Sequence, residues 1–277
     1  MEKKQRIRKI LCTIFSFLLS MTLFATLIVG VLRFTLLDKD FFVNELEKSN
    51  YSQTLYEKII EELSGEGYVS GFDEEFFSQI LSEETVKTPV LSAVDRIYAT
   101  GEYKAASVEE NTQKFYEEFV KSLEGRGVTV EEEQKTHIQA FAKDCAEFLS
   151  STARLPFLSV AESLIRTMKP LVNYAMIFLG AFALFCVLFI VLTTPKSRES
   201  LRFLSYGLTG TALMTAAPSI VLLASGLLKK ISIADKAFYD LVQTIGTDIS
   251  YIILWTAVAV LAVSAILTTI YFVPKKQ

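Results

Sequence analysis

The sequence predicts an all-α integral membrane protein with four transmembrane helices and an extracytoplasmic α-helical domain between the first and the second of them. Two observations lead to this fold class. Four windows of the chain contain no Asp, Glu, Lys, Arg or His, and the long segment between the first two windows is dense in charge. Each window exceeds the ~20 residues that a helix needs to cross ~30 Å of hydrocarbon. The windows are Ile10–Leu32, Leu171–Leu192, Phe203–Leu228 and Ser250–Val273.

A third observation, the distribution of basic residues, predicts the orientation of the chain. Residues 1–9, 193–202 and 274–277 alternate onto one side of the membrane, and together they hold ten Lys and Arg against two acidic residues. Basic flanks are retained in the cytoplasm. We therefore expect a multi-pass protein of the cell membrane, with both termini cytoplasmic and residues 34–169 outside.

The first transmembrane helix of the predicted layout is an uncleaved signal anchor. The first apolar run is longer than the ~7–15 residues of the apolar region in a cleaved signal peptide and lacks a clean small-residue cleavage site, so we expect it to stay uncleaved. The parts are a basic N-terminus (1–9), transmembrane helix 1 (10–32), the acidic helical domain (34–169), transmembrane helix 2 (171–192), a basic loop (193–202), transmembrane helix 3 (203–228), an outer amphipathic helix (229–249), transmembrane helix 4 (250–273) and a tail (274–277).

The predicted outer domain is strongly acidic. Residues 34–169 hold 26 Asp and Glu against 14 Lys and Arg, a net charge of −12 that the whole-chain value of −3 conceals. A domain this acidic does not bind nucleic acid by counterion release. Its acids are either solvated helix faces or a surface for a cationic ligand or a basic partner. Cys145 is its one cysteine, so the domain has no internal disulfide and must be held by its core.

Apolar residues at helical spacing predict the first helices of this domain. A stripe over residues 51–63 indicates a helix that the glycine-rich stretch 65–71 ends, and a short helix follows Asp73. Thr88 and Pro89 fit the N-cap and the first residue of a third helix. The three stripes are Leu55, Tyr56, Ile59, Ile60 and Leu63; Phe76, Phe77, Ile80 and Leu81; and Val90, Val94, Ile97 and Tyr98.

Two capping boxes, Ser107 with Glu110 and Thr129 with Glu132, predict the next two helices. A further helix over residues 157–168 is expected to lead to Pro170 at the start of transmembrane helix 2. Nothing alternates like a strand, so the domain is predicted to be a bundle of four to six helices. The stripes of the two capped helices are Phe115, Tyr116, Phe119, Val120 and Leu123, and Ile138, Phe141, Ala142, Cys145, Phe148 and Leu149.

The loop before transmembrane helix 4 carries a helical pattern of its own. Ser232 and Asp235 resemble a capping box, and Gly246 resembles a C-terminal cap. Such an amphipathic helix lies in the outer membrane interface or packs under the helical domain, and the pattern does not choose between the two. Its apolar face includes Phe238, Leu241, Val242 and Ile245.

Transmembrane helix 3 carries a face of small and hydroxyl-bearing residues. Such residues let helices approach closely and hydrogen-bond across the contact. We expect this face to pack against another helix of the same chain or against a partner. It consists of Gly207, Gly210, Thr211, Thr215 and Ser219, and helix 4 offers Ala257, Leu261, Ser264 and Thr268 as a complementary seam.

No motif of a known chemistry is present in the sequence. His137 is the one histidine, and its place at the edge of an apolar stripe is typical of a partly exposed surface residue. Residues 131–133 are three glutamates that resemble a cation site, but they fit the first turn of a helix, where the helix dipole stabilises acids. We therefore expect no catalytic residue, no metal and no cofactor, and a protein that is not an enzyme.

These features predict a non-enzymatic multi-pass membrane protein with an outward-facing helical interaction domain, an accessory or scaffold subunit of an envelope complex. Its expected partners are the lipid bilayer and either another membrane protein or a second copy of the chain, and no nucleic acid. The alternative is a transport or lipid-handling component with a groove among the four transmembrane helices. The lack of ionisable residues in the four windows argues against proton-coupled transport by the chain alone. A hydrolase built on two converging carboxylates is a third reading.

Overall fold

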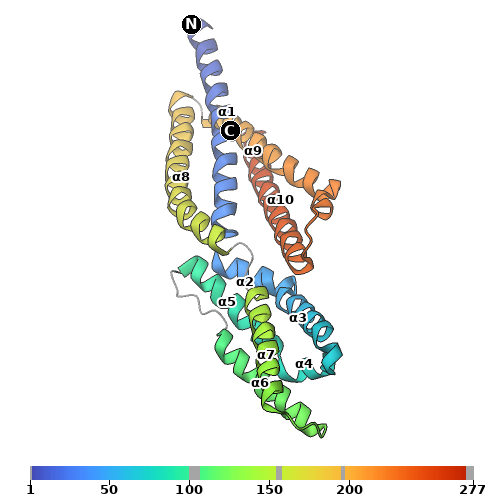
Figure 1. Cartoon of the computed structure of the whole chain (residues 1–277). Helices are drawn as coiled ribbons and strands as arrows, with labels where there is room; N and C mark the ends of the chain where they lie inside the picture. The colour runs from blue at the N-terminus through green and yellow to red at the C-terminus, as the bar shows by residue number, and fades with distance from the viewer. Residues whose placement is uncertain (1, 100–106, 154–157, 195–196, 273–277) are drawn as a thin grey trace. The chain divides into compact units, whose positions relative to one another are not determined.

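The computed structural model describes residues 2–99, 107–153, 158–194 and 197–272, and within these residues the chain forms only helices (Figure 1). The chain divides into two compact units. We call the first the membrane unit, which comprises Met1–Asp38, Thr167–Ser232 and Val242–Gln277. We call the second the helical domain, which comprises Lys39–Arg166 and Ile233–Leu241.

Four helices of the described residues are long and apolar enough to cross a membrane, as the sequence predicts. They are α1 (Glu2–Phe34), α8 (Leu158–Thr193), α9 (Ser197–Ser225) and α10 (Lys236–Phe272). Only 17% to 28% of their most apolar windows is buried inside the protein. A continuous apolar surface of this size is left exposed by proteins that bind membranes or partners, so its exposure fits contact with lipid.

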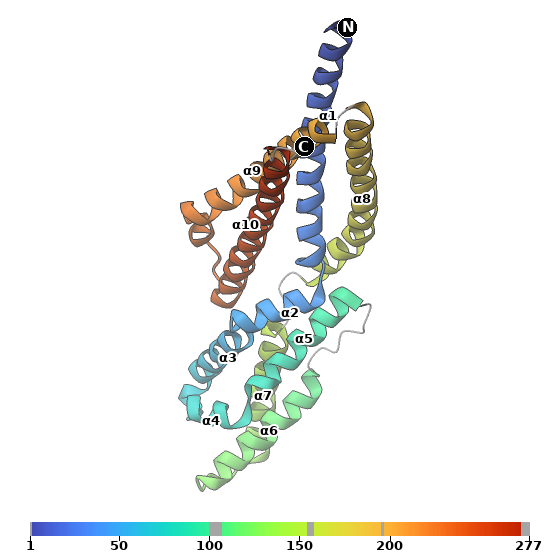
Figure 2. The same cartoon turned by 180° about the vertical axis from the view of Figure 1, so that it is seen from behind.

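Helix α1 lies between α8 and α9 in both views of the membrane unit (Figures 1 and 2). On the α8 side, the ring of Phe15 stacks on Phe189 with centroids 3.7 Å apart and meets Phe185 edge-on at 6.0 Å. On the α9 side, the hydroxyl of Ser16 donates a hydrogen bond to the carbonyl of Phe203 at 2.7 Å. Helix α1 is therefore the shared packing partner of its two neighbours.

The contact between α1 and α9 depends on close approach of the two backbones. A Cβ atom at Gly207 would come within 3.1 Å of the carbonyl oxygen of Ser16, and a Cβ atom at Gly210 would collide with the side chain of Ser20. The hydroxyl of Thr211 lies within hydrogen-bond distance of two carbonyls, 2.9 Å from that of Gly207 and 3.2 Å from that of Ser20. Small residues are what allow this approach.

A cluster of hydroxyl groups joins α9 to α10. Ser264 donates to the carbonyl of Ser205 at 3.0 Å, and its oxygen lies 2.7 Å from that of Thr209. The hydroxyls of Ser205 and Thr268 lie 2.5 Å apart. Hydrocarbon offers no competing water, so these bonds hold the two helices where they cross.

The helical domain buries apolar stripes from several short helices against one another. Helices α6 and α7 form an antiparallel pair joined by a tight turn (Figure 1). The elements of this unit are α2 (Lys39–Lys48), α3 (Tyr51–Gly67), the 3₁₀ helix η1 (Tyr68–Ser70), α4 (Glu74–Ile80), α5 (Glu83–Ala99), α6 (Val108–Gly125) and α7 (Glu132–Thr152). Its most buried side chains include Tyr51, Ile59, Leu63, Phe77, Val86, Val90, Phe115, Phe119, Cys145 and Leu149.

Two predicted helix starts are confirmed by side-chain caps, and a third, predicted with Ser232 as its N-cap, lies three residues further on at Asp235. The carboxylate of Asp73 accepts the N–H of Phe76 at 3.0 Å, and the hydroxyl of Ser107 accepts the N–H of Glu110 at 3.2 Å. Asp235 accepts the N–H of Phe238 at 2.9 Å and so begins α10. In each case the cap satisfies a backbone donor that has no partner within the helix.

Two other predicted starts are wrong. Helix α5 begins at Glu83, so Pro89 lies inside it and Thr88 is no N-cap. Val86 is fully buried on the same stripe as Val90, and its burial holds the extra turns in spite of the missing proline N–H. The N-cap of α7 is Glu131 rather than Thr129, because the side chain of Gln134 accepts the N–H of Glu131 at 3.0 Å.

The two predicted breaks beside the transmembrane helices are also wrong. Helix α8 passes through Pro170, and helices in the membrane tolerate proline where neighbouring groups satisfy the freed carbonyl. Helix α10 passes through Gly246 without ending. Gly246 serves close packing instead, because a Cβ atom there would lie 2.7 Å from the side chain of Leu228 in η2 (Leu227–Lys230).

Replacing Gly207 tests the close contact of α1 with α9. We expect Gly207→Leu to lower the stability of the purified protein in detergent by about 1–3 kcal/mol, because the larger side chain overpacks against α1. Gly180→Leu in α8 is the matched control, since nothing lies within 4 Å of a Cβ atom there. Thermal unfolding in the same detergent measures both, and equal shifts would remove the case for a glycine-dependent contact.

Candidate functional site

A cluster of phenylalanine rings forms the centre of the helical domain. Phe119 of α6 is fully buried. Its ring centroid lies 4.6 Å from that of Phe72 and 5.2 Å from that of Phe141 of α7. Aromatic pairs at these distances stabilise a core beyond the area they bury. The same ring also meets Phe76, Phe77 and Phe115.

The turn between α3 and α4 brings Phe72 into this cluster. Gly67 packs so closely that a Cβ atom there would lie 2.8 Å from the carbonyl oxygen of Phe72. Gly71 has a φ of +76°, a backbone conformation that favours glycine. The guanidinium of Arg126 lies over the Phe72 ring, 5.7 Å from its centroid. Gly67 and Gly71 therefore allow the turn that positions the Phe72 ring.

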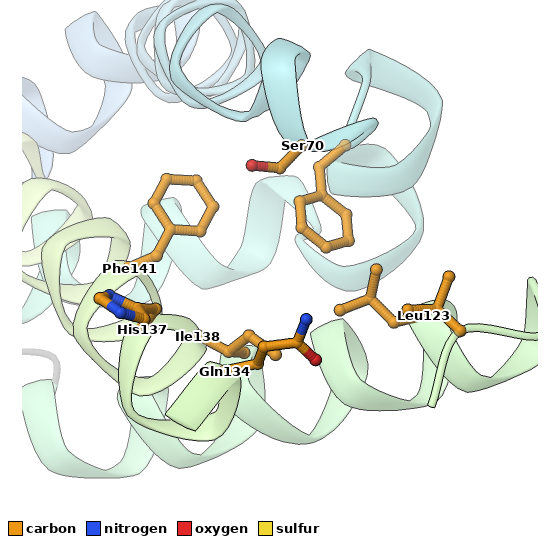
Figure 3. A pocket seen from close by; sticks show the side chains of 8 residues that line it. Ser70, Leu123, Gln134, His137, Ile138 and Phe141 are labelled. Atoms are coloured by element: carbon orange, nitrogen blue, oxygen red, sulfur yellow. The ribbon is translucent and has the colours of Figure 1, made fainter. Parts of the chain in front are cut away.

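An apolar cleft opens beside this cluster, at the end of the α6–α7 pair (Figure 3). Its volume is about 350 Å³. In Figure 3, Ser70 of η1 lies across the opening from Gln134 and Ile138 of α7. The lining residues are Ser70, Phe72, Leu123, Val128, Gln134, His137, Ile138 and Phe141. The cleft thus combines apolar walls with three side chains that are able to hydrogen-bond.

Exposed apolar side chains lie next to the cleft in the sequence. Tyr68 is 77% exposed and Val69 is 95% exposed, and they are the two residues before the lining residue Ser70. Val128, in the turn between α6 and α7, is itself a lining residue and 44% exposed. Apolar groups gathered at one surface are typical of a site that another molecule covers. We call this cleft together with Tyr68 and Val69 the apolar cleft surface.

What this surface offers chemically is apolar contact with a few hydrogen bonds. His137 is exposed at its edge, as the sequence predicts. Burial raises the pKa of the nearby core thiol of Cys145 to about 12, so this cysteine stays protonated and unreactive at neutral pH. Among the described residues, no three His, Cys, Asp or Glu side chains gather closely enough to hold a metal ion. Glu132 and Glu133 lie in the first turn of α7.

The small-residue face predicted on transmembrane helix 3 lies on α9. Gly207, Gly210 and Thr211 contact α1 of the same chain. Thr215 is buried and donates to the carbonyl of Thr211 at 2.8 Å. Ser219 is buried too, and its hydroxyl has no hydrogen-bond partner among the described residues. Three of the five predicted residues therefore meet at one intramolecular contact.

The apolar face predicted before transmembrane helix 4 lies on the first turns of α10. Leu241 is buried, and Phe238, Val242 and Ile245 are half-buried. Residues Ile233–Leu241 belong to the helical domain. Lys58 of α3 pairs with Asp235 at 2.8 Å. Phe238 and Leu241 thus belong to the helical domain, whereas Val242 and Ile245 belong to the membrane unit.

The environment of Asp235 favours its charged form. Partial burial alone would raise its pKa, but hydrogen bonds from Lys58 and from the backbone N–H groups of Phe238 and Ala237 outweigh burial and lower the pKa. A carboxyl whose pKa is lower in the folded state stabilises the fold above its unfolded pKa. That contribution is lost as the pH falls through the folded value.

Sequence reasoning did not find the apolar cleft surface. It identified Phe119, Ile138 and Phe141 as members of helical stripes, placed Val69 only in the helix-ending stretch 65–71 and did not place Phe72. One signal in the sequence could have indicated this surface. Tyr68 and Val69 are an apolar pair between glycines, whereas a solvent-exposed turn usually contains polar residues at such positions.

Removing the Asp235 side chain tests its role in the helical domain. We expect Asp235→Ala to lower stability by about 1 kcal/mol at pH 7, because the helix loses its cap. Asp235→Asn keeps the cap and loses the charge. The stability gap between the wild type and the Asn variant should shrink as the pH falls below about 3.9. Thermal unfolding from pH 3 to pH 8 measures this, and a gap that widens on acidification contradicts the assignment.

Comparison of the chain with protein-family models, with curated proteins and with solved structures finds no match. The function of the chain must therefore be inferred from its own residues. The two features available for that inference are the four apolar helices of the membrane unit and the apolar cleft surface of the helical domain.

Proposed function

We propose that the chain is a non-enzymatic multi-pass protein of the cell membrane whose outward-facing helical domain binds a protein partner through the apolar cleft surface. In this role it is an accessory or scaffold subunit of an envelope complex. The observation that carries the proposal is the open cleft of about 350 Å³ next to Tyr68 and Val69, two side chains that water surrounds in the isolated chain. Covering such side chains favours association, and tyrosine is enriched where proteins meet.

The proposed orientation places both termini in the cytoplasm. Ten of the twelve charged residues in the two terminal segments and the loop 193–202 are basic. Arg8 of α1 pairs with Glu199 at the start of α9 at 3.7 Å, which supports placing the N-terminus and this loop on the same side of the membrane unit. Basic segments flanking apolar helices are retained inside. The helical domain then lies outside.

The charge of the helical domain supports a particular class of partner. With a net charge of −12 over residues 34–169, the domain attracts cationic surfaces at long range and repels acidic ones. The cleft supplies short-range apolar contact. We therefore propose a partner that presents an apolar side chain or turn flanked by basic residues.

The orientation is tested by labelling a single exposed cysteine in intact cells. Gly65 lies on the surface of α3 with nothing within 4 Å of a Cβ atom, and all three native cysteines are buried. We expect Gly65→Cys to react with a membrane-impermeant maleimide in intact cells. Gln5→Cys, near the N-terminus, should react only after lysis. The reverse pattern would overturn the topology and the outside position of the helical domain.

The binding surface is tested with a photoreactive amino acid at Val69 in intact cells. We expect a discrete protein adduct from Val69 and none from Gln113, an exposed residue at the start of α6. Ile138→Glu places a charge in the cleft and should abolish the adduct. Gln139→Glu makes a similar charge change at the next, exposed position and should preserve it.

Two outcomes of the cross-linking experiment contradict the proposal. Equal adducts from Val69 and Gln113 would mean that the apolar cleft surface is not selective. An adduct made of lipid alone would favour the alternative function, a lipid-handling component, over a protein-binding subunit.

A further inference from the structure

A second cavity lies between α9 and α10 in the membrane unit. Its volume is about 330 Å³. One cation, hydroxyl groups and aromatic rings line it, whereas the cleft of the helical domain has mostly apolar walls. The residues are Arg202, Ser205 and Tyr206 of α9 and Thr268, Tyr271 and Phe272 of α10.

This cavity lies at the end of two apolar spans. Arg202 is the last charged residue before the charge-free window that begins at Phe203, and Phe272 is the last residue of α10. Tyr206 is half-exposed, and its ring and hydroxyl suit the boundary between hydrocarbon and water. The cavity therefore sits at the depth where lipid headgroups meet the acyl chains.

The guanidinium of Arg202 is arranged for an anion. Its Nε donates to the hydroxyl of Tyr206 at 2.7 Å, and its carbon lies 5.4 Å from the centroid of the same ring. Tyr271 lines the same cavity. Among the described residues, Arg202 forms no ion pair with a carboxylate. The nearest acid in the sequence, Glu199, pairs with Arg8.

Further hydrogen-bond donors converge on the same space. The Tyr206 oxygen accepts from Arg202, so its own O–H is left to donate to a ligand. A guanidinium has several N–H donors in one plane, and a phosphate group accepts two of them side by side. The hydroxyls of Ser205 and Thr268, which bond to each other, form a polar wall of the cavity.

We propose that this cavity binds the phosphate group of an anionic glycerophospholipid, with Arg202 as the charge partner and Tyr206 as a hydrogen-bond donor. The rings of Tyr206, Tyr271 and Phe272 then lie along the upper acyl chains. Basic pockets between transmembrane helices are suited to lipids of this class. The proposal does not depend on the function of the helical domain, because every group involved belongs to the membrane unit.

The test uses the purified full chain in nanodiscs of phosphatidylcholine alone or with phosphatidylglycerol. Native mass spectrometry counts the phosphatidylglycerol molecules retained per chain, and thermal unfolding reports stabilisation. We expect the wild type to retain phosphatidylglycerol and Arg202→Gln to bind it about tenfold more weakly, the size of one lost charge-assisted hydrogen bond. Arg33→Gln is the matched control. Arg33 lies in the last turn of α1 and donates a hydrogen bond to Asn173, so this variant should bind phosphatidylglycerol like the wild type.

Tyr206→Phe keeps the ring and removes one hydroxyl, so it provides a second variant if Arg202→Gln fails to fold. We expect it to weaken phosphatidylglycerol binding while leaving unfolding in phosphatidylcholine unchanged. Equal binding by the wild type, Arg202→Gln and Tyr206→Phe would overturn the proposal, because the retained lipid would then be unspecific. Stabilisation by inorganic phosphate in phosphatidylcholine nanodiscs, equal to that by phosphatidylglycerol, would overturn the assignment to a lipid and point to a soluble phosphate.

Discussion

The membrane unit depends on the close approach of α1 to its two neighbours. Hydrocarbon solvates a leucine as well as another helix does, so apolar burial does not drive these helices together as it would in water. The stacked rings of Phe15 and Phe189 on one side and the contact at Gly207 on the other are close-range interactions that lipid does not replace. Hydroxyl groups such as Ser264 add hydrogen bonds where no water competes. The cavity beside Arg202 lies where these hydrogen bonds join the first turns of α9 to the last turns of α10.

The helical domain is held by a different force. Most of the stability of a helix in water-soluble structure comes from the packing of its apolar face, and each main helix of this domain buries such a stripe. Phe119 makes ring contacts that join residues of α4, α6 and α7. The apolar cleft surface lies where this burial is incomplete. Val69 lies at its edge and is 95% exposed.

The sequence predicts the helices better than it predicts what they surround. Four charge-free windows suffice to predict four long helices, because a charged side chain in hydrocarbon is costly and the absence of charge leaves a clear pattern. Caps at Asp73 and Ser107 were predictable because each accepts a hydrogen bond from a backbone N–H only three residues further on. The start of α5 was not predictable, because it depends on the burial of Val86 against other helices of the domain. The cleft was not predictable either, because a stripe such as the one through Ile138 indicates which side faces inward but not whether another segment fills the space there.

The burial of the cysteines makes the fold independent of the redox conditions around it. Cys12, Cys145 and Cys186 are the three cysteines of the chain, and all are buried and unpaired. No covalent link between helices is made or broken when the ratio of oxidants to thiols in the environment changes. The fold is thus indifferent to redox conditions, and a cell needs no enzyme of disulfide formation to produce it. The same chain is expected to assemble equally well in a reducing translation extract and at an oxidising cell surface.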